Sequence, residues 1–268
     1  MTKRLFTFGC SYTDYYWPTW ANFFGSLYDE HHNWGCVGGG NQFIFESLVE
    51  CNISHHFNEN DTIVVMWSTY QRFDLYLDHW ITPGNIYNSS YSEDWIEKYW
   101  SIKGGILHSL NYISAAQLIL DALNVEWAMA SMCDLLDPFG EKKSKFSNIR
   151  KWLKQSKLNL FDEYPKMKKY ETIFTNKNMI SPPLNDFCKR YRKDDFNFNR
   201  HNKSIVDYHP TPLMHLEWTQ QILAPHFGII SDASDILEQW QSLCSTRIVD
   251  VETSLNYTNS LHIKPNRI

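Results

Sequence analysis

Short apolar runs alternate with helical patterns along the first half of the chain. Apolar runs of strand length, rich in β-branched residues, are typical of buried strands, and the expected strands are 4–9, 31–34, 61–67 and 125–130. Apolar residues at helical spacing predict helices at 17–24, 42–56 and 92–123, the last broken at Gly104-Gly105. Strands and helices therefore alternate up to about residue 136.

This alternation is typical of a parallel sheet with helices on both faces. The sequence thus predicts an α/β fold, a three-layer αβα sandwich around a central parallel sheet, and 268 residues suit a single domain, 1–268. Residues 137–205 break the rhythm with charges, Asn, Lys and Pro182-Pro183, so we expect an inserted flap or subdomain there. Helical patterns return from Pro210 and at 236–243.

The charges are divided unevenly along the chain. Residues 141–203 hold 17 Lys and Arg against 7 Asp and Glu (+10), and the rest holds 8 against 23 (−15), which together give the net charge of −5. A basic segment on an acidic body indicates either a surface that faces an anionic ligand or a solvated helical face. Aromatic residues make up 16% of the chain, with 11 Trp, which suits either a large aromatic core or a ligand groove.

Other features bear on location and cofactors. The sequence has no run of 18 apolar residues and no basic-then-apolar leader, so we expect a cytoplasmic protein without a membrane partner. Six scattered cysteines without a CxxC pair fit reduced thiols. The pairs His31-His32 and His55-His56 lack a metal-site pattern, because adjacent side chains face different ways, and we expect no metal and no cofactor.

Three polar segments stand where an open α/β sheet carries its chemistry. The first, Phe8-Gly9-Cys10-Ser11, places a serine after the first strand, at the sheet edge where ligands bind. The second is the glycine stretch 35–40, whose backbone amides can approach a ligand closely, followed by Asn41. The third is Asp207-Tyr208-His209-Pro210, where a carboxylate two residues from a histidine can fix its tautomer and leave Nε2 as a base.

Together these segments resemble the SGNH (GDSL-like) hydrolase superfamily. Ser11 stands where the family has its nucleophilic serine, and Asn33-x-Gly35-x-x-Gly38 is similar to the second block, which supplies an oxyanion amide from Gly38. Asp207 and His209 resemble the terminal Asp and His of the family. The resemblance implies a flavodoxin-like SGNH fold, a Ser11–His209–Asp207 triad, and oxyanion donors from the Ser11 and Gly38 amides.

The resemblance covers about 1–136 and 205–230. The family's third block supplies an oxyanion asparagine after the third strand, but segment 67–74 reads Trp-Ser-Thr-Tyr-Gln-Arg-Phe-Asp here. Our hypothesis is that Asn41 provides this donor. The alternatives are Thr69 or Gln71, or loss of the donor.

Other residues at the same predicted edge are candidates for substrate binding. These are Tyr12, Thr69 and Arg72; Arg72 could meet a substrate carboxylate or phosphate, or form a surface ion pair with Asp74. Cys10 is a competing nucleophile. Because adjacent side chains point apart where a strand enters a turn, only one of Cys10 and Ser11 can face His209.

The function predicted from these features is a serine esterase that cleaves O-acyl esters, first of all O-acetyl esters of carbohydrates, through an acyl-serine intermediate. Its partner is then a small-molecule or glycan ester. One alternative is a sugar O-acyltransferase that uses the same site. Another is a non-catalytic protein on this fold that binds carbohydrate or nucleic acid, although the acidic remainder of the chain argues against nucleic acid.

Overall fold

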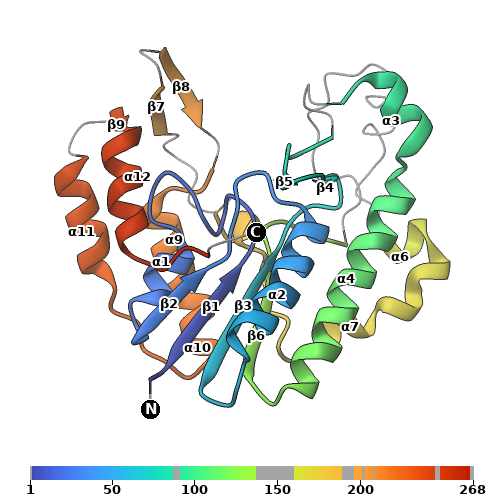
Figure 1. Ribbon diagram of the computed structural model, residues 1–268, viewed down its shortest axis with the longest axis horizontal. Coiled ribbons are helices and arrows are strands. Elements are labelled where there is room, and N and C mark those ends of the chain that lie inside the picture. Colours follow the sequence, from blue (N-terminus) through green and yellow to red (C-terminus); the bar gives the residue numbers. More distant parts are fainter. Residues whose placement is uncertain are drawn as a thin grey trace.

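Four strands form one parallel sheet at the centre of the molecule (Figure 1). A computed structural model describes residues 2–86, 91–136, 160–188, 196–200, 203–207, 209–244 and 248–265. The strands are β1 (Arg4–Phe8), β2 (Glu30–Asn33), β3 (Asp61–Trp67) and β6 (Glu126–Ser131), in spatial order β2-β1-β3-β6. All neighbours pair in parallel. The order reverses between β1 and β3, and ligands of open α/β sheets bind at the carboxyl ends of the strands beside such a reversal.

Helices cover both faces of this sheet, which confirms the predicted three-layer α/β fold. One face carries α2 (Asn41–His55) and α4 (Ile102–Ala122), and the other carries α1 (Trp20–Gly25), α8 (Leu184–Cys188) and α9 (Pro212–Trp218). Successive side chains of β3 point alternately to the two faces, so each face has its own part of the core. Ile63 and Val65 pack in the α2–α4 core, whereas Val64 and Met66 pack in the core of the opposite face.

The predicted helix 92–123 is wrong in its break point. It consists of α3 (Glu93–Tyr99) and α4, which separate at Trp100-Ser101 and not at Gly104-Gly105. Ser101 caps α4, because its Oγ accepts a hydrogen bond from Gly104 N at 3.0 Å. Gly105 lies within α4, and this position is occupied by glycine because a Cβ there would come 2.6 Å from the Tyr70 carbonyl oxygen. The segment between β3 and α3 contains a short hairpin, β4 (Leu75–Tyr76) and β5 (Trp80–Ile81).

The described part of the expected insertion packs with the main body. Residues 160–188 form α6 (Leu160–Glu163), the 3₁₀ helix η1 (Pro165–Tyr170), α7 (Thr172–Thr175) and α8. Leu160 and Ile173 join the core beneath α4, and Leu184 joins the core of the other face. Ile180 N donates to Met129 O at 2.7 Å, so this stretch also borders β6. The inserted flap or subdomain expected at 137–205 stays a prediction, and its residues 137–159, 189–195 and 201–202 lie outside the described ones.

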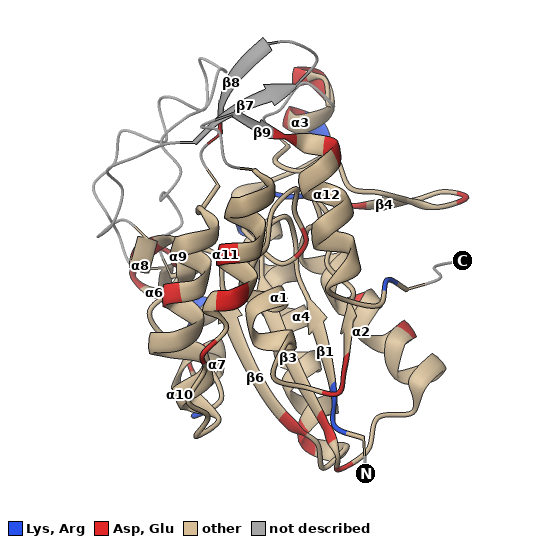
Figure 2. Cartoon of the chain, turned by 90° about the vertical axis from the view of Figure 1, so that its left-hand side faces the viewer, with Lys and Arg blue, Asp and Glu red and all other residues tan. Residues whose placement is uncertain are grey.

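Acidic positions are spread over the described body. Figure 2 shows Asp and Glu on several helices and at the end of the sheet near the N-terminus, with few Lys and Arg among them. Much of the basic segment 141–203 is not described, so the choice between a surface for an anionic ligand and a solvated helical face stays open there. Within the described ranges, no helix combines the length and the apolar character that a bilayer crossing requires.

A second, smaller sheet stands beyond the carboxyl end of the main one. It contains β7 (Phe196–Arg200), β8 (Lys203–Asp207) and β9 (Ile248–Asp250), in the order β8-β7-β9. Figure 1 shows β7 and β8 at the same end of the molecule as β4, β5 and α3. Among the described residues, further helices are the π-helix η2 (Thr219–Leu223), α10 (Ala224–His226), α11 (Ser234–Leu243) and α12 (Val251–Ser260).

After α12 the chain returns to the free edge of β2. Ile263 N donates to His31 O at 2.7 Å, and Asn33 N donates to Ile263 O at 3.0 Å. The next residue, Lys264, extends the contact to the turn after β1, since its Nζ lies 3.1 Å from Asp14 Oδ2. The C-terminal tail, defined as 262–265, therefore closes the β2 edge and contacts the turn that contains Ser11.

Candidate active site

A tight turn after β1 places Ser11 at the edge of the sheet. Thr13 N and Asp14 N both donate to Cys10 O, at 2.8 and 3.1 Å. Gly9 is required at the start of the turn, since a Cβ there would lie 2.0 Å from Thr13 Oγ1. Cys10 points into the core, where its Sγ lies 3.6 Å from Met132 Sδ. Cys10 and Ser11 thus face apart, and the serine belongs to the site described below.

His209 reaches Ser11 from the far end of the chain. Its Nε2 lies 2.9 Å from Ser11 Oγ, although 198 positions separate the two residues. Asp207, the last residue of β8, accepts from His209 N at 2.8 Å and pairs with His209 Nδ1 at 2.7 Å through the same Oδ1. Because a carboxylate only accepts, Nδ1 carries the proton and Nε2 is left to accept from the serine hydroxyl.

The segment after His209 is held firmly against the Ser11 turn. Pro210 O accepts a hydrogen bond from Trp17 Nε1 at 3.0 Å. Thr211 then caps α9, where its Oγ1 accepts from Met214 N at 3.3 Å. These contacts fix the backbone on one side of the imidazole, and β8 fixes it on the other.

Tyr15 completes this group, and the sequence analysis did not single it out. Its ring stacks on the His209 ring, with centroids 4.1 Å apart and planes inclined by 26°. Its hydroxyl donates to Asp207 Oδ2 at 2.5 Å. A signal was present, because Tyr15 lies only four residues after Ser11 in an aromatic stretch, but its direction depends on the fold of the turn.

Hydrogen bonding keeps Asp207 ionised. Burial acts to raise the pKa of Asp207, but hydrogen bonds from His209 and Tyr15 outweigh it and hold the pKa below its ordinary value. The carboxylate is therefore charged at neutral pH. Such a charge stabilises an imidazolium formed at His209.

The glycine stretch lies beside the serine turn. Cys36 N donates to Gly9 O at 3.1 Å, which ties the two loops together. Gly38 has a φ of +83°, and a Cβ on it would meet Thr82 O at 2.1 Å, so only glycine fits. Neither Ser11 N nor Gly38 N donates a hydrogen bond to another group in the described part of the chain. Both amides are thus available to a ligand.

Asn41 has a different place from the one we expected. Its Nδ2 donates to Ser68 O at 3.1 Å and to Ser109 Oγ at 2.9 Å, and its Oδ1 accepts from Ser68 N at 2.8 Å. Both amide hydrogens are therefore committed within the protein, and this geometry leaves none for an oxyanion. Asn41 instead joins the end of β3 to α4.

The two alternative donors after β3, Thr69 and Gln71, differ in the hydrogen bonds that they already form. Gln71 Nε2 lies 3.5 Å from Tyr70 OH, and its Oε1 accepts from Asn85 Nδ2 at 2.9 Å. Thr69 Oγ1 accepts from Gln71 N at 2.9 Å, a contact that leaves the hydroxyl proton of Thr69 for another partner. Thr69 stays a candidate for the missing donor.

The other two candidate binding residues lie on either side of this region. The Tyr12 ring meets the His209 ring edge-on at 5.5 Å, so Tyr12 forms a wall of the site. Arg72 Nη1 donates to Gly39 O at 2.8 Å, behind the glycine stretch. The Arg72 charge also lowers the pKa of Asp74, but burial has the larger effect and raises that pKa to about 6.

Comparisons with known proteins add little to this geometry. No family model matches the chain, and no curated protein does. A solved structure from Bacteroides fragilis NCTC 9343, provisionally assigned there as an acylhydrolase, is similar with a TM-score of 0.34 and 13% identity. That match covers 66% of this chain and 66% of the other. The described residues contain no group of three or more His, Cys, Asp and Glu that could hold a metal ion.

Proposed function

We propose that this protein is a serine esterase that cleaves O-acyl esters, with carbohydrate acetates as the first candidates. The observation that carries the proposal is the hydrogen-bonded chain from Ser11 Oγ through His209 to Asp207, with distances of 2.9 and 2.7 Å. A serine hydroxyl is a weak nucleophile unless an oriented base removes its proton. The three groups have the spacing and orientation that this activation needs.

The reaction proceeds in two halves. As Ser11 Oγ attacks the ester carbonyl carbon, its proton passes to His209 Nε2, and the carbonyl oxygen becomes an oxyanion. His209 then gives the proton to the departing alcohol, the C–O bond breaks, and an acyl-serine remains. A water molecule attacks the acyl group while losing a proton to His209, and collapse returns that proton to Ser11 and releases the acid.

The oxyanion needs donors that are already in place. We assign this role to Ser11 N and Gly38 N, which are uncommitted in the described chain. Each donor of this kind is worth on the order of 100- to 1000-fold in turnover. Thr69 is the candidate for a third. If a sugar hydroxyl takes the place of water in the second half-reaction, the same site acts as an acyltransferase.

Two measurements on Ser11→Ala test the proposal. With p-nitrophenyl acetate we expect kcat/KM to fall about 10⁴-fold or more, since the nucleophile is lost. A fluorophosphonate probe should label the wild type at Ser11 and should not label the variant. Cys10→Ala is the matched control, because it alters the neighbouring side chain and leaves the Ser11–His209 contact in place. Equal rates in wild type and Ser11→Ala would refute the serine mechanism, and loss of turnover only in Cys10→Ala would identify a thiol nucleophile.

A further inference from the structure

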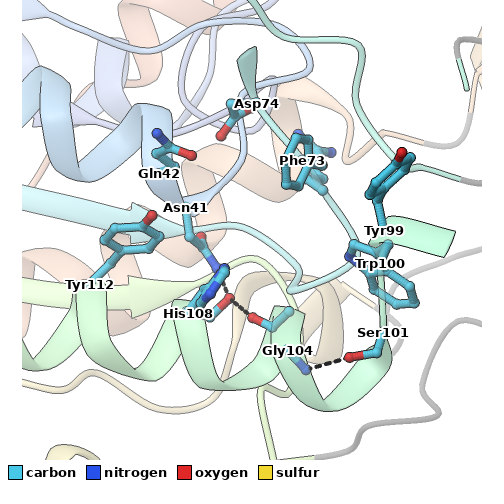
Figure 3. A pocket seen from close by; sticks show the side chains of 13 residues that line it. Asn41, Gln42, Phe73, Asp74, Tyr99, Trp100, Ser101, Gly104, His108 and Tyr112 are labelled. Carbon is cyan, nitrogen blue, oxygen red and sulfur yellow. Dashed lines mark hydrogen bonds between the residues drawn. The ribbon is translucent and has the colours of Figure 1, made fainter. Parts of the chain in front are cut away.

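A pocket whose wall bonds to the glycine stretch is not used by the reaction. It is a cavity of about 100 Å³ between the first turn of α2, the segment after β3, and the junction of α3 with α4. We call it the α2–α4 pocket, and its principal lining residues are Gln42, Arg72, Asp74, Trp100, His108 and Tyr112. Figure 3 shows five of these side chains, all but Arg72, with their labels around the hollow. Neither Ser11 nor His209 lines it.

The pocket wall holds the loop that contains Gly38. Arg72 Nη1 donates to Gly39 O at 2.8 Å, and Asp74 Oδ1 accepts from Gly40 N at 2.8 Å. Gly39 and Gly40 directly follow Gly38, whose amide we assign to the oxyanion. A ligand in the pocket would therefore contact Arg72 and Asp74, the two side chains that hold the loop containing Gly38.

The charges in the pocket favour an uncharged ligand. Arg72 and Asp74 have opposite charges, and they interact, since the Arg72 charge lowers the pKa of Asp74. A strongly ionic ligand would be attracted by one and repelled by the other. A neutral ligand with oxygen atoms avoids this conflict and can still form hydrogen bonds with both.

The polar and aromatic groups suit a carbohydrate. Arg72 Nε is buried and has no hydrogen-bond partner among the described residues, so it can donate to a ligand oxygen. Trp100 and Tyr112 supply rings, against which the C–H groups of a sugar substituent pack, while Gln42 supplies an amide. Pockets that combine aromatic walls with a few fixed polar groups are typical of small-molecule sites.

The volume sets the size of the bound group. A cavity of about 150 Å³ holds a benzene molecule. At about 100 Å³, the α2–α4 pocket holds a substituent and not a whole pyranose ring. We propose that it is a sugar subsite, which binds a neutral, oxygen-bearing substituent of a carbohydrate ester whose acyl group is cleaved at Ser11. This inference rests on the proposed esterase function.

The experiment compares two esters in each variant. p-Nitrophenyl acetate carries no sugar, whereas β-D-glucose pentaacetate carries several neutral substituents. The measured quantity is the kcat/KM for glucose pentaacetate divided by that for p-nitrophenyl acetate. We expect this ratio to fall about tenfold or more in Gln42→Leu and in Trp100→Ala, and to stay at the wild-type value in Lys103→Ala, an exposed position on α4 outside the pocket. Gln42→Leu keeps the test valid if loss of the Trp100 ring impairs folding.

The other outcomes overturn the subsite. An unchanged ratio in Gln42→Leu and in a folded Trp100→Ala would do so, as would a wild type that cleaves p-nitrophenyl acetate and not glucose pentaacetate. Competitive inhibition of glucose pentaacetate cleavage by inorganic phosphate, if lost in Gln42→Leu, would identify an anion site instead. Failure of the esterase proposal is recognised separately, because Ser11 would then remain unlabelled by the fluorophosphonate probe.

Discussion

At the scale of single residues, Tyr15 connects two members of the site at once. Its ring lies on the His209 ring, and its hydroxyl donates to Asp207 Oδ2. The hydrogen bond withdraws charge from the carboxylate that faces His209, while the stacked ring fixes the plane of the imidazole. Tyr15 is therefore a positioning residue, which acts through its contacts with His209 and Asp207 and not by touching the substrate.

Tyr15→Phe separates these two effects, because it removes the hydroxyl and keeps the ring. The hydrogen bond from Tyr15 lowers the pKa of Asp207, so its loss raises that pKa and makes the carboxylate a stronger partner for a proton on His209. We expect the acid limb of the pH profile of kcat/KM to move to higher pH and kcat to fall by about tenfold, with KM little changed. Steady-state kinetics with p-nitrophenyl acetate from pH 4 to 9 measure both.

A matched loss of a tyrosine hydroxyl serves as the control. Tyr170 OH donates to Asn111 Oδ1 at 2.6 Å on the surface beside α4. Tyr170→Phe should leave the pH profile in place. A profile for Tyr15→Phe that coincides with that of the wild type would show that the hydroxyl has no influence on the base.

At the scale of elements, helix α2 begins on a carboxylate that is distant in sequence. Asp74 accepts from Gly40 N at 2.8 Å and from Phe43 N at 3.0 Å, so it caps the helix without belonging to it. Burial raises the pKa of Asp74 to about 6, against these hydrogen bonds and the Arg72 charge, which lower it. Ionised Asp74 is thus stabilised by its partners but penalised by burial.

This pKa predicts a pH-dependent stability. The unfolded chain ionises Asp74 near pH 4, whereas the folded chain keeps the proton until about pH 6. Because the folded state binds more protons in that window, its stability falls as the pH rises from about 4 to 6, by up to about 3 kcal/mol. Urea unfolding of wild type and Asp74→Asn should show a difference in free energy that changes across this window. Asp78→Asn, at an exposed position, should show no such change.

The elements that the sequence predicts well are those whose signal is local. β3 has the predicted bounds because Thr62, Ile63 and Val64 belong to an apolar, β-branched run that remains buried on both faces. The sequence misplaces the break before α4 because glycine lowers helix propensity and so indicated a break at Gly104-Gly105. Gly105 is needed for another reason, since the Tyr70 carbonyl oxygen lies against it in the folded chain. Local patterns do not record such contacts.

The candidate site follows the same division. Ser11, Asp207 and His209 were recognisable because each stands in a short polar segment at the end of a predicted strand or before a helix, and the structure brings them together. The role expected for Asn41 is not supported, because Ser68 and Ser109 use both hydrogens of its amide. The sequence does not show these bonds, since the two serines are 27 and 68 positions away. Such commitments depend on tertiary structure.

At the scale of the whole molecule, the C-terminal tail contributes to the sheet. Ile263 pairs with β2, and Lys264 contacts Asp14 in the turn that contains Ser11. The Ile263 side chain is half exposed, so Ile263 contributes to the stability of the fold mainly through its backbone hydrogen bonds and not through core packing. The tail thus supports the serine turn from outside the main sheet.

Ile263→Pro tests this contribution, because proline has no N–H to donate to His31 O. We expect the free energy of unfolding to fall by about 1–3 kcal/mol, since a backbone hydrogen bond is lost and His31 O is left unsatisfied. Ile263→Ala keeps the N–H and should lose much less. Chemical denaturation of the two variants measures the difference, and equal losses would assign the effect to the side chain instead.

The contact between Ser11 and His209 also has a consequence for synthesis. A ribosome makes the histidine 198 positions after the serine, and β9, which pairs with β7 beside the strand that ends at Asp207, later still. No nascent fragment that ends before this histidine can hydrolyse an ester by the proposed route. The onset of turnover during translation would therefore mark the moment at which the segments that carry Ser11 and His209 first meet.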